Sequence, residues 1–264
     1  MMANCYRSHG EKPFHVLAIH GGPGASGSLY DLCEKIGKET GIVELLNQGE
    51  SIEAQINEIH KVVNALADQP VILIGHSWGA WLSIYYENAH PQVVKKIILV
   101  SSGPFDQDYV NHIEQTRNNR MSRKTKEKLS EHFVKINEMD ETIANEHFAK
   151  AGQIISSLDS FDVYQEDISE KTNIDMNIYR KVWSEAAQRR KSGQLIEAVK
   201  KVKCPITVIH GDHDPHPLEG IKKPLEREGL DVEVFLLSKC GHYPWREKNA
   251  KETFYKIIEN LINN

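Results

Sequence analysis

The strongest constraint on the fold of this chain is the alternation of short apolar runs with segments of helical periodicity. Six runs are apolar enough to form buried strands, and most of them are unbroken by polar residues. Apolar strands that alternate with helices form a parallel sheet with helices on both faces. We therefore expect an α/β fold with a mostly parallel central sheet flanked by helices. The predicted strands cover residues 14–20, 41–46, 71–75, 94–101, 206–210 and 232–237.

The segments between these runs place apolar residues three and four positions apart, which is typical of amphipathic helices. Ser51 precedes such a segment, which runs from Ile52 to Leu66, and its hydroxyl is expected to cap the helix. Further helices are predicted over residues 80–88 and 248–262. These helices supply the layers that cover the sheet.

One long region breaks the alternation. From about Gly103 to Lys200 no run resembles a strand, and charged segments of helical period follow one another. This region is too long to be a loop in a compact domain. We predict that residues 1–103 and 201–264 form the core and that residues 104–200 form a helical insertion.

Composition and charge narrow the class of partner. The chain carries 32 basic and 37 acidic residues, a net charge of −5, which gives no electrostatic reason to expect nucleic acid or an anionic membrane. The apolar runs are too short to span a bilayer, and the first residues lack the pattern of a signal peptide. Four scattered cysteines without CxxC spacing favour free thiols, so we expect a cytoplasmic protein.

The first chemical motif is Gly75-His76-Ser77-Trp78-Gly79, which fits G-x-S-x-G between a predicted strand and a predicted helix. A sharp turn there would raise the Ser77 hydroxyl above the sheet edge on a strained backbone. A chain with 17 glycines can match so short a motif by chance, and a helix-capping serine is the alternative. The position between strand and helix favours a nucleophile elbow.

The second motif is the glycine-rich run at residues 20–24, His-Gly-Gly-Pro-Gly, after the first clear strand. Such a loop can turn backbone N–H groups toward a ligand. In an acyl-transfer enzyme it would form an oxyanion hole together with the N–H of Trp78. Gly22 is the first candidate for the loop donor and Gly21 the second.

The third motif, residues 210–216, is rich in His and Asp and follows a predicted strand. An acid at this place can orient an imidazole and stabilise its cation. Asp214 is favoured because it lies beyond the turn made by Gly211, and Asp212 is the alternative. A metal site is a further alternative, although neighbouring residues of one tight loop rarely converge on one ion.

The fourth motif is Cys240-Gly241-His242, between the last predicted strand and the last helix. Gly241 permits a turn that brings His242 back over the sheet edge as general base for Ser77. Cys240 is a weaker candidate nucleophile, because no helix start accompanies it. Ser77, Asp214 and His242 follow one another in the order nucleophile, acid, base.

With these motifs in place, the sequence resembles the α/β-hydrolase fold superfamily, and most of all its HGGPG-type, prolyl iminopeptidase-like branch. The resemblance covers residues 14–103 and about 193–264. It implies a Ser77–His242–Asp214 triad, an oxyanion hole from Gly22 and Trp78, and a cap formed by residues 104–200. It implies no metal or organic cofactor.

The resemblance has departures. The chain is short before the first motif, so one or two early strands of the family sheet are expected to be missing or poorly formed. The loop over residues 46–51 lacks the Asp-x-Arg-Gly pattern of relatives. The predicted cap does not match the prolyl iminopeptidase cap in any obvious way.

We therefore predict a serine hydrolase that cleaves a small ester or amide, with a small-molecule or short-peptide substrate. A proline-type aminopeptidase and a non-catalytic ligand-binding protein on the same fold remain alternatives. A perhydrolase or a C–C hydrolase also stays open, whereas Ser77 at the elbow argues against carbon–halogen cleavage. In an aminopeptidase, cap carboxylates would bind the substrate amine, and the candidates are Glu138, Asp140, Glu141, Glu146 and Glu185.

Two further features of the predicted cap have ordinary structural interpretations. The basic run from Arg117 to Lys128 is interpreted as a solvated helix face, with attraction of an acidic substrate as the alternative. Tyr179 and Trp183 lie four residues apart and are interpreted as cap core, with a substrate platform as the alternative.

Overall fold

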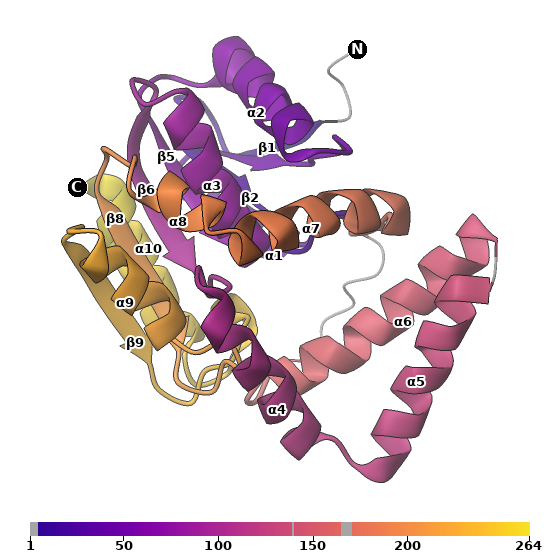
Figure 1. Ribbon diagram of the computed structural model, residues 1–264. Helices are drawn as coiled ribbons and strands as arrows, with labels where there is room; N and C mark the ends of the chain where they lie inside the picture. Colours follow the sequence, from indigo (N-terminus) through magenta and orange to yellow (C-terminus); the bar gives the residue numbers. More distant parts are fainter. Residues whose placement is uncertain (1–4, 139, 165–170) are drawn as a thin grey trace.

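The computed structural model describes residues 5–138, 140–164 and 171–264, and a central sheet runs through it (Figure 1). Within these residues seven strands pair in the order β1-β4-β2-β5-β6-β8-β9. Every neighbouring pair is parallel except the edge pair of β1 and β4. The predicted α/β fold is therefore confirmed. The strands are β1 (Tyr6–His9), β2 (Val16–Ile19), β4 (Ile42–Leu45), β5 (Val71–His76), β6 (Val94–Val100), β8 (Ile206–Gly211) and β9 (Val232–Leu237).

The six predicted strands are all present, and β1 precedes them. One early strand of the sheet is thus formed in the described residues, where one or two were expected to be missing. Its sequence, Tyr-Arg-Ser-His, is polar and partly exposed, because it lies at the sheet edge with one neighbour only. An edge strand of this kind has no apolar run to identify it.

Helices cover both faces of the sheet, because successive side chains of a strand point to opposite faces. Leu17 and Leu73 belong to the apolar cluster that includes α2, α3 and α9. Their neighbours Val16 and Ile72 belong to a second cluster with α1 and α10. These helices are α1 (Tyr30–Ile36), α2 (Ile52–Leu66), α3 (Trp78–Ala89), α9 (Glu219–Arg227) and α10 (Lys251–Asn263).

Helix α2 shows how local sequence defines an element. The Ser51 hydroxyl accepts a hydrogen bond from the backbone N–H of Ala54 at 3.1 Å, as expected for an N-cap. Ile52, Ile59 and Val63 then bury one helix face against the sheet. The prediction for this helix is confirmed at both ends.

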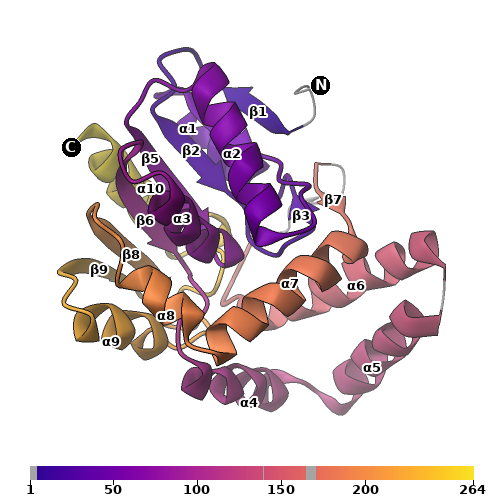
Figure 2. The same cartoon turned by 45° about the horizontal axis from the view of Figure 1, so that its top comes forward.

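The segment from 104 to 200 is largely helical. Helices α5 and α6 lie side by side and project from the rest of the molecule (Figures 1 and 2). Helices α7 and α8 return to the sheet, and Val182 and Leu195 join the same apolar cluster as α2 and α3. The elements are α4 (Val110–Arg120), α5 (Arg123–Glu138), α6 (Glu141–Asp159), α7 (Met176–Lys191) and α8 (Gln194–Val199).

A two-residue strand, β7 (Asn173–Ile174), also lies in this segment and pairs with β3 (Ala25–Ser26). The expectation of no strand between residues 103 and 200 is corrected by this short pair. Two residues are too few to give an apolar run in the sequence. In the described residues no helix is both long and apolar enough to cross a membrane.

Candidate active site

Ser77 lies at the turn between β5 and α3, on a left-handed backbone with φ of 52° and ψ of −111°. The strain predicted for this residue is thus present. A side chain on Gly75 would meet the carbonyl oxygen of Gly79 at 2.4 Å, and one on Gly79 would meet the carbonyl oxygen of Ile19 at 2.1 Å. Both glycines are therefore required by close backbone contacts at the turn that carries Ser77.

The glycine-rich loop lies directly against this turn. A side chain on Gly21 would reach within 3.0 Å of the Ser77 Cβ atom. Gly22 has a φ of 61°, a conformation that L-residues with side chains rarely adopt. The loop also contacts the start of α7, because the N–H of Asp175 donates to the carbonyl of Gly24 at 2.8 Å.

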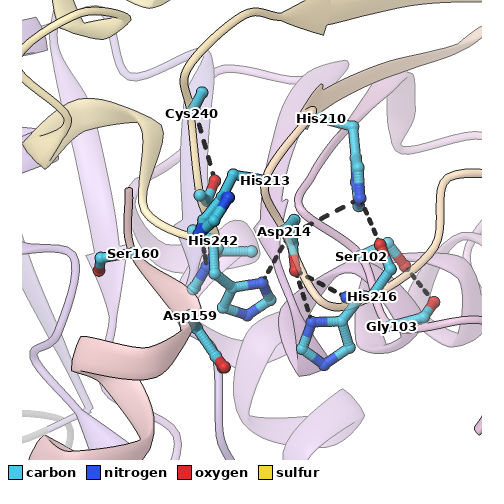
Figure 3. A network of polar contacts seen from close by, with 12 residues as sticks. Ser102, Gly103, Asp159, Ser160, His210, His213, Asp214, His216, Cys240 and His242 are labelled. Carbon is cyan, nitrogen blue, oxygen red and sulfur yellow. Dashed lines mark hydrogen bonds and ion pairs between the residues drawn. The ribbon is translucent and has the colours of Figure 1, made fainter. Parts of the chain in front are cut away.

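The structure brings Asp214 and His242 together. They follow β8 and β9, and the Nδ1–H of His242 donates to Asp214 Oδ2 at 2.7 Å (Figure 3). The Asp214 side chain is fully buried and the His242 side chain is 5% exposed. The alternative acid, Asp212, is exposed and accepts the N–H of Cys240 at 3.1 Å. Of the two candidate acids, Asp214 is therefore the one that hydrogen-bonds His242.

Electrostatics keeps the Asp214 carboxylate ionised. Burial alone would raise its pKa, but the imidazoles of His242, His216 and His210 hold the pKa well below its usual range. Figure 3 shows these rings around the carboxylate. An ionised acid of this kind can stabilise an imidazolium on His242.

His76 connects the nucleophile turn to the histidine loop. Its Nε2–H donates to the backbone carbonyl of His242 at 3.0 Å, and the two rings lie 4.8 Å apart. Burial, followed by the charge of His242, lowers the pKa of His76 well below the ordinary value. The residue before Ser77 thus contacts the candidate base. In the described part of the chain, the Ser77 hydroxyl itself has no hydrogen-bond partner, so the contact to the histidine loop is made by His76 and not by Ser77.

Sequence reasoning missed His216, which is the second imidazole on Asp214. Its Nδ1–H donates to Asp214 Oδ1 at 2.7 Å, and its backbone N–H donates to the same oxygen at 2.9 Å. Three histidines on the acid loop, His210, His213 and His216, made the sequence ambiguous, because only the path of the loop decides which ring turns inward.

Asp214, His216 and His242 could also hold a metal ion, since one ligand atom from each lies within 4.8 Å of the others. In this arrangement, however, each imidazole Nδ1 bonds a different carboxylate oxygen. Hydrogen bonds account for the cluster without an ion.

A buried glutamate supports the histidine loop. Glu247 Oε1 accepts the N–H groups of Gly241 and Phe161, at 2.9 and 2.8 Å, and Oε2 accepts that of Asp162 at 2.8 Å. A side chain on Gly241 would meet the carbonyl oxygen of Asp159 at 2.2 Å. The loop is therefore fixed against the segment that follows α6. This role of Glu247 has no signal in the sequence.

The basic run of the sequence is only partly a solvated face. Arg120 turns inward and donates to the carbonyl oxygens of Leu158 and His213, both at 2.7 Å. Arg123, by contrast, makes an exposed pair with Glu127. The interpretation as a solvated helix face is thus wrong for Arg120, which lies beside the acid loop.

Most of the carboxylates that the sequence offers as ligands for a substrate amine bind other groups of the protein within the described residues. Asp140 caps α6, Glu146 pairs with Lys150, and Glu185 bonds Arg189 and the backbone N–H of Ile52. The side chain of Glu138 lies outside the described residues. Each of these three carboxylates therefore already has a partner within the protein.

Aromatic rings connect α7 to the core, as the interpretation of Trp183 as packing residue predicts. Trp183 stacks on Trp81 at 5.7 Å and on Tyr179 at 6.2 Å. Arg190 lies over the Trp81 ring at 5.1 Å, and burial lowers its pKa to about 10. This stack fixes the position of α7 above α3.

The chain matches known proteins along most of its length. A family model described as the alpha/beta hydrolase fold covers residues 15–245. The proline iminopeptidase of Lactobacillus helveticus (strain DPC 4571) is 23% identical over 265 residues, which cover 90% of this chain and 86% of that protein.

Solved structures share the fold at lower identity. The crystal structure of VinJ resembles this one with a TM-score of 0.70 at 16% identity, covering 98% of this chain and 94% of the other. That of E-2-(acetamidomethylene)succinate hydrolase has a TM-score of 0.64 at 15% identity, covering 100% and 97%.

Proposed function

The chain belongs to the alpha/beta hydrolase fold family, and on this premise we propose that it is a serine hydrolase that cleaves a small ester or amide through an acyl-enzyme. Ser77 is the nucleophile, His242 the general base and Asp214 the orienting acid. The observation that carries the proposal is the 2.7 Å bond between buried His242 and Asp214, at the sheet edge where the Ser77 turn lies.

In the first half of the reaction, Ser77 Oγ attacks the substrate carbonyl carbon while His242 Nε2 takes the hydroxyl proton. The Asp214 carboxylate holds the ring in the Nδ1–H tautomer, which leaves Nε2 free as base. His242 then gives the proton to the leaving oxygen or nitrogen as its bond to the carbonyl carbon breaks. In the second half, water attacks the Ser77 ester and His242 repeats the same proton transfers.

The negative oxygen of the tetrahedral intermediate would lie between the backbone N–H groups of Gly22 and Trp78. Trp78 is the first residue of α3, so its N–H belongs to the unpaired donors of a helix start. The positive end of the helix dipole also favours charge at this point. Gly21 remains the alternative loop donor, since it approaches Ser77 closely.

The proposal requires a bond between Ser77 Oγ and His242 Nε2. Among the described residues the Ser77 hydroxyl has no hydrogen-bond partner that would have to be broken, and the proposal has rotation about its Cα–Cβ bond direct it to the ring. Hydrogen bonds of this kind often tighten only when the substrate is present.

A proline-type aminopeptidase is the second candidate, favoured by the match to the Lactobacillus protein. Its substrate carries a free amine that needs a carboxylate partner. Asp159 is a buried carboxylate whose backbone carbonyl accepts the N–H of His242, but Arg117 already binds it through two hydrogen bonds. Because Asp159 is already paired, we favour an ester or amide substrate that lacks a free amine.

Kinetics of matched variants test the proposal. Ser77→Ala and His242→Gln should keep the circular dichroism spectrum of the wild type and lower kcat on a p-nitrophenyl ester by about 10³ or more. An unchanged kcat in Ser77→Ala would remove Ser77 from the mechanism. A panel of short esters, thioesters, lactones and prolyl-naphthylamide then separates the candidates. Cleavage of prolyl-naphthylamide alone would support the aminopeptidase. A pure ligand-binding protein would cleave none of them.

A further inference from the structure

Both oxygens of the Asp214 carboxylate are engaged, and they face different histidines. Oδ2 accepts the Nδ1–H of His242 at 2.7 Å. Oδ1 accepts two donors from His216, the ring Nδ1–H at 2.7 Å and the backbone N–H at 2.9 Å. A carboxylate fixed at Oδ1 by two donors cannot rotate, so Oδ2 stays directed at His242.

His216 is itself held from two sides. Its backbone carbonyl accepts the Nε2–H of His210 at 2.7 Å. Its ring stacks on the His242 ring, with centroids 4.4 Å apart and planes inclined by 27° (Figure 3). His216 therefore contacts both the acid and the base, while its side chain is only 12% exposed.

We propose that His216 is a positioning residue of the catalytic machinery, which locks the Asp214 carboxylate through Oδ1 and packs on the His242 ring. This inference rests on the proposed function of Ser77, His242 and Asp214. It assigns His216 no contact with the substrate or the reacting atoms.

His216 can do this as long as its Nδ1 carries hydrogen, as it does in the neutral Nδ1–H tautomer. The groups that face it are Asp214, His242 and His210 on the two loops and Arg117 on α4. Burial first, and then the charges of His242 and Arg117, oppose protonation and lower the pKa of His216 to about 4, although Asp214 acts in the other direction. His216 therefore stays neutral, with its hydrogen on Nδ1, at pH values above about 4.

Loss of the His216 side chain should make His242 more basic. Without the Nδ1–H donor, the Asp214 carboxylate is more negative toward His242, and without the stacked ring more water reaches His242. Both changes favour the imidazolium. The acid limb of the kcat/KM profile should then move to higher pH.

Two variants of similar shape isolate the hydrogen bond. In His216→Asn the amide N–H lies near the place of the imidazole Nδ1–H, whereas His216→Leu has no donor. We expect His216→Leu to lower kcat about 10- to 100-fold, the size of loss seen when the outer hydrogen-bond partner of a metal ligand is removed. The acid limb of the pH profile of kcat/KM for His216→Leu should move to higher pH by about 0.5 unit or more. His216→Asn should stay within a few-fold of the wild type. If His216→Leu does not fold, His216→Gln replaces it, since its amide lies one bond too far away.

His213→Asn is the matched control, because His213 lies on the same loop but its ring packs edge-on against Phe161. It should leave kcat and the pH profile unchanged. Asp214→Asn, measured alongside, tests the function on which the inference rests and should be nearly inactive.

The possible outcomes are distinct. If His216→Leu matches His213→Asn in kcat and profile while Asp214→Asn is inactive, the positioning role is wrong and the function stands. A lower kcat in His216→Leu without a shifted limb also contradicts the role, because a fraction of misfolded enzyme would give the same result. An active Asp214→Asn would overturn both.

Discussion

Arg117 of α4 holds Asp159 at the end of α6 through two hydrogen bonds, Nε to Oδ1 at 2.8 Å and Nη2 to Oδ2 at 2.5 Å. The backbone carbonyl of Asp159 in turn accepts the N–H of His242 at 2.9 Å. Burial would lower the pKa of Arg117, but the Asp159 carboxylate outweighs it and raises the pKa. The ion pair thus connects the proposed cap to the loop that carries the candidate base.

Removal of the arginine should destabilise the protein, because it leaves a buried carboxylate without a partner. Arg117→Met is expected to lower the free energy of unfolding by about 3 kcal/mol. The double variant Arg117→Met/Asp159→Asn should lose less, since the neutral amide costs less to bury. Urea denaturation measures both.

The exposed pair Arg123–Glu127 supplies the control. Arg123→Met should change the free energy of unfolding by about 0.5 kcal/mol or less. Equal losses for the two arginine variants would contradict a special role for the buried pair.

The nucleophile turn should be intolerant of a single methyl group. Gly79→Ala would place Cβ 2.1 Å from the carbonyl oxygen of Ile19, which is backbone and cannot move aside. We expect a loss of about 3 kcal/mol or more in the free energy of unfolding. Gly152→Ala in α6 has open space around its Cβ and should instead gain about 0.5–1 kcal/mol. A well-folded, fully active Gly79→Ala enzyme would show that the turn is built differently.

Acid should destabilise the fold near neutral pH. Burial lowers the pKa of His20, His76 and His216, so the folded protein binds their protons only at lower pH than the unfolded chain. The unfolded chain begins to bind them at about pH 6.5. Stability is therefore complete above that pH and falls below it, by up to about 1.4 kcal/mol per pH unit for each histidine.

Urea denaturation at pH 7.5, 6.0 and 5.0 checks this slope. His20→Asn removes one of the three groups and should flatten the slope by about one proton. His112→Asn, at an exposed position of α4, should not change it. Stability that stays constant or rises toward pH 5 would contradict the buried neutral state.

The sheet and the nucleophile turn could be predicted from sequence because both depend on local patterns. Buried parallel strands are continuous apolar runs, and the Gly-x-Ser-x-Gly spacing follows from a steric requirement at Gly75 and Gly79. The edge strand β1 was not predicted, because an exposed edge strand needs no apolar pattern in its sequence.

The contacts that support the site were not predictable in the same way. Arg117 and Asp159 lie 42 residues apart, and the two faces of α4 look equally polar in the sequence. Glu247 and His216 act through the conformation of their loops, which depends on packing against the segment after α6. Spacing alone therefore located Ser77, Asp214 and His242 as candidates, but it did not reveal the residues that hold them.

The most direct test of the proposed mechanism is peptide mapping by mass spectrometry after reaction with a fluorophosphonate, which forms a covalent bond with an activated serine. We expect a single adduct on the peptide that contains Ser77 and loss of esterase activity in step with labelling. We expect no adduct in Ser77→Ala, and slow labelling in His242→Gln because the base is missing. An adduct on another residue, or an unlabelled Ser77 in an active enzyme, would contradict the proposed mechanism.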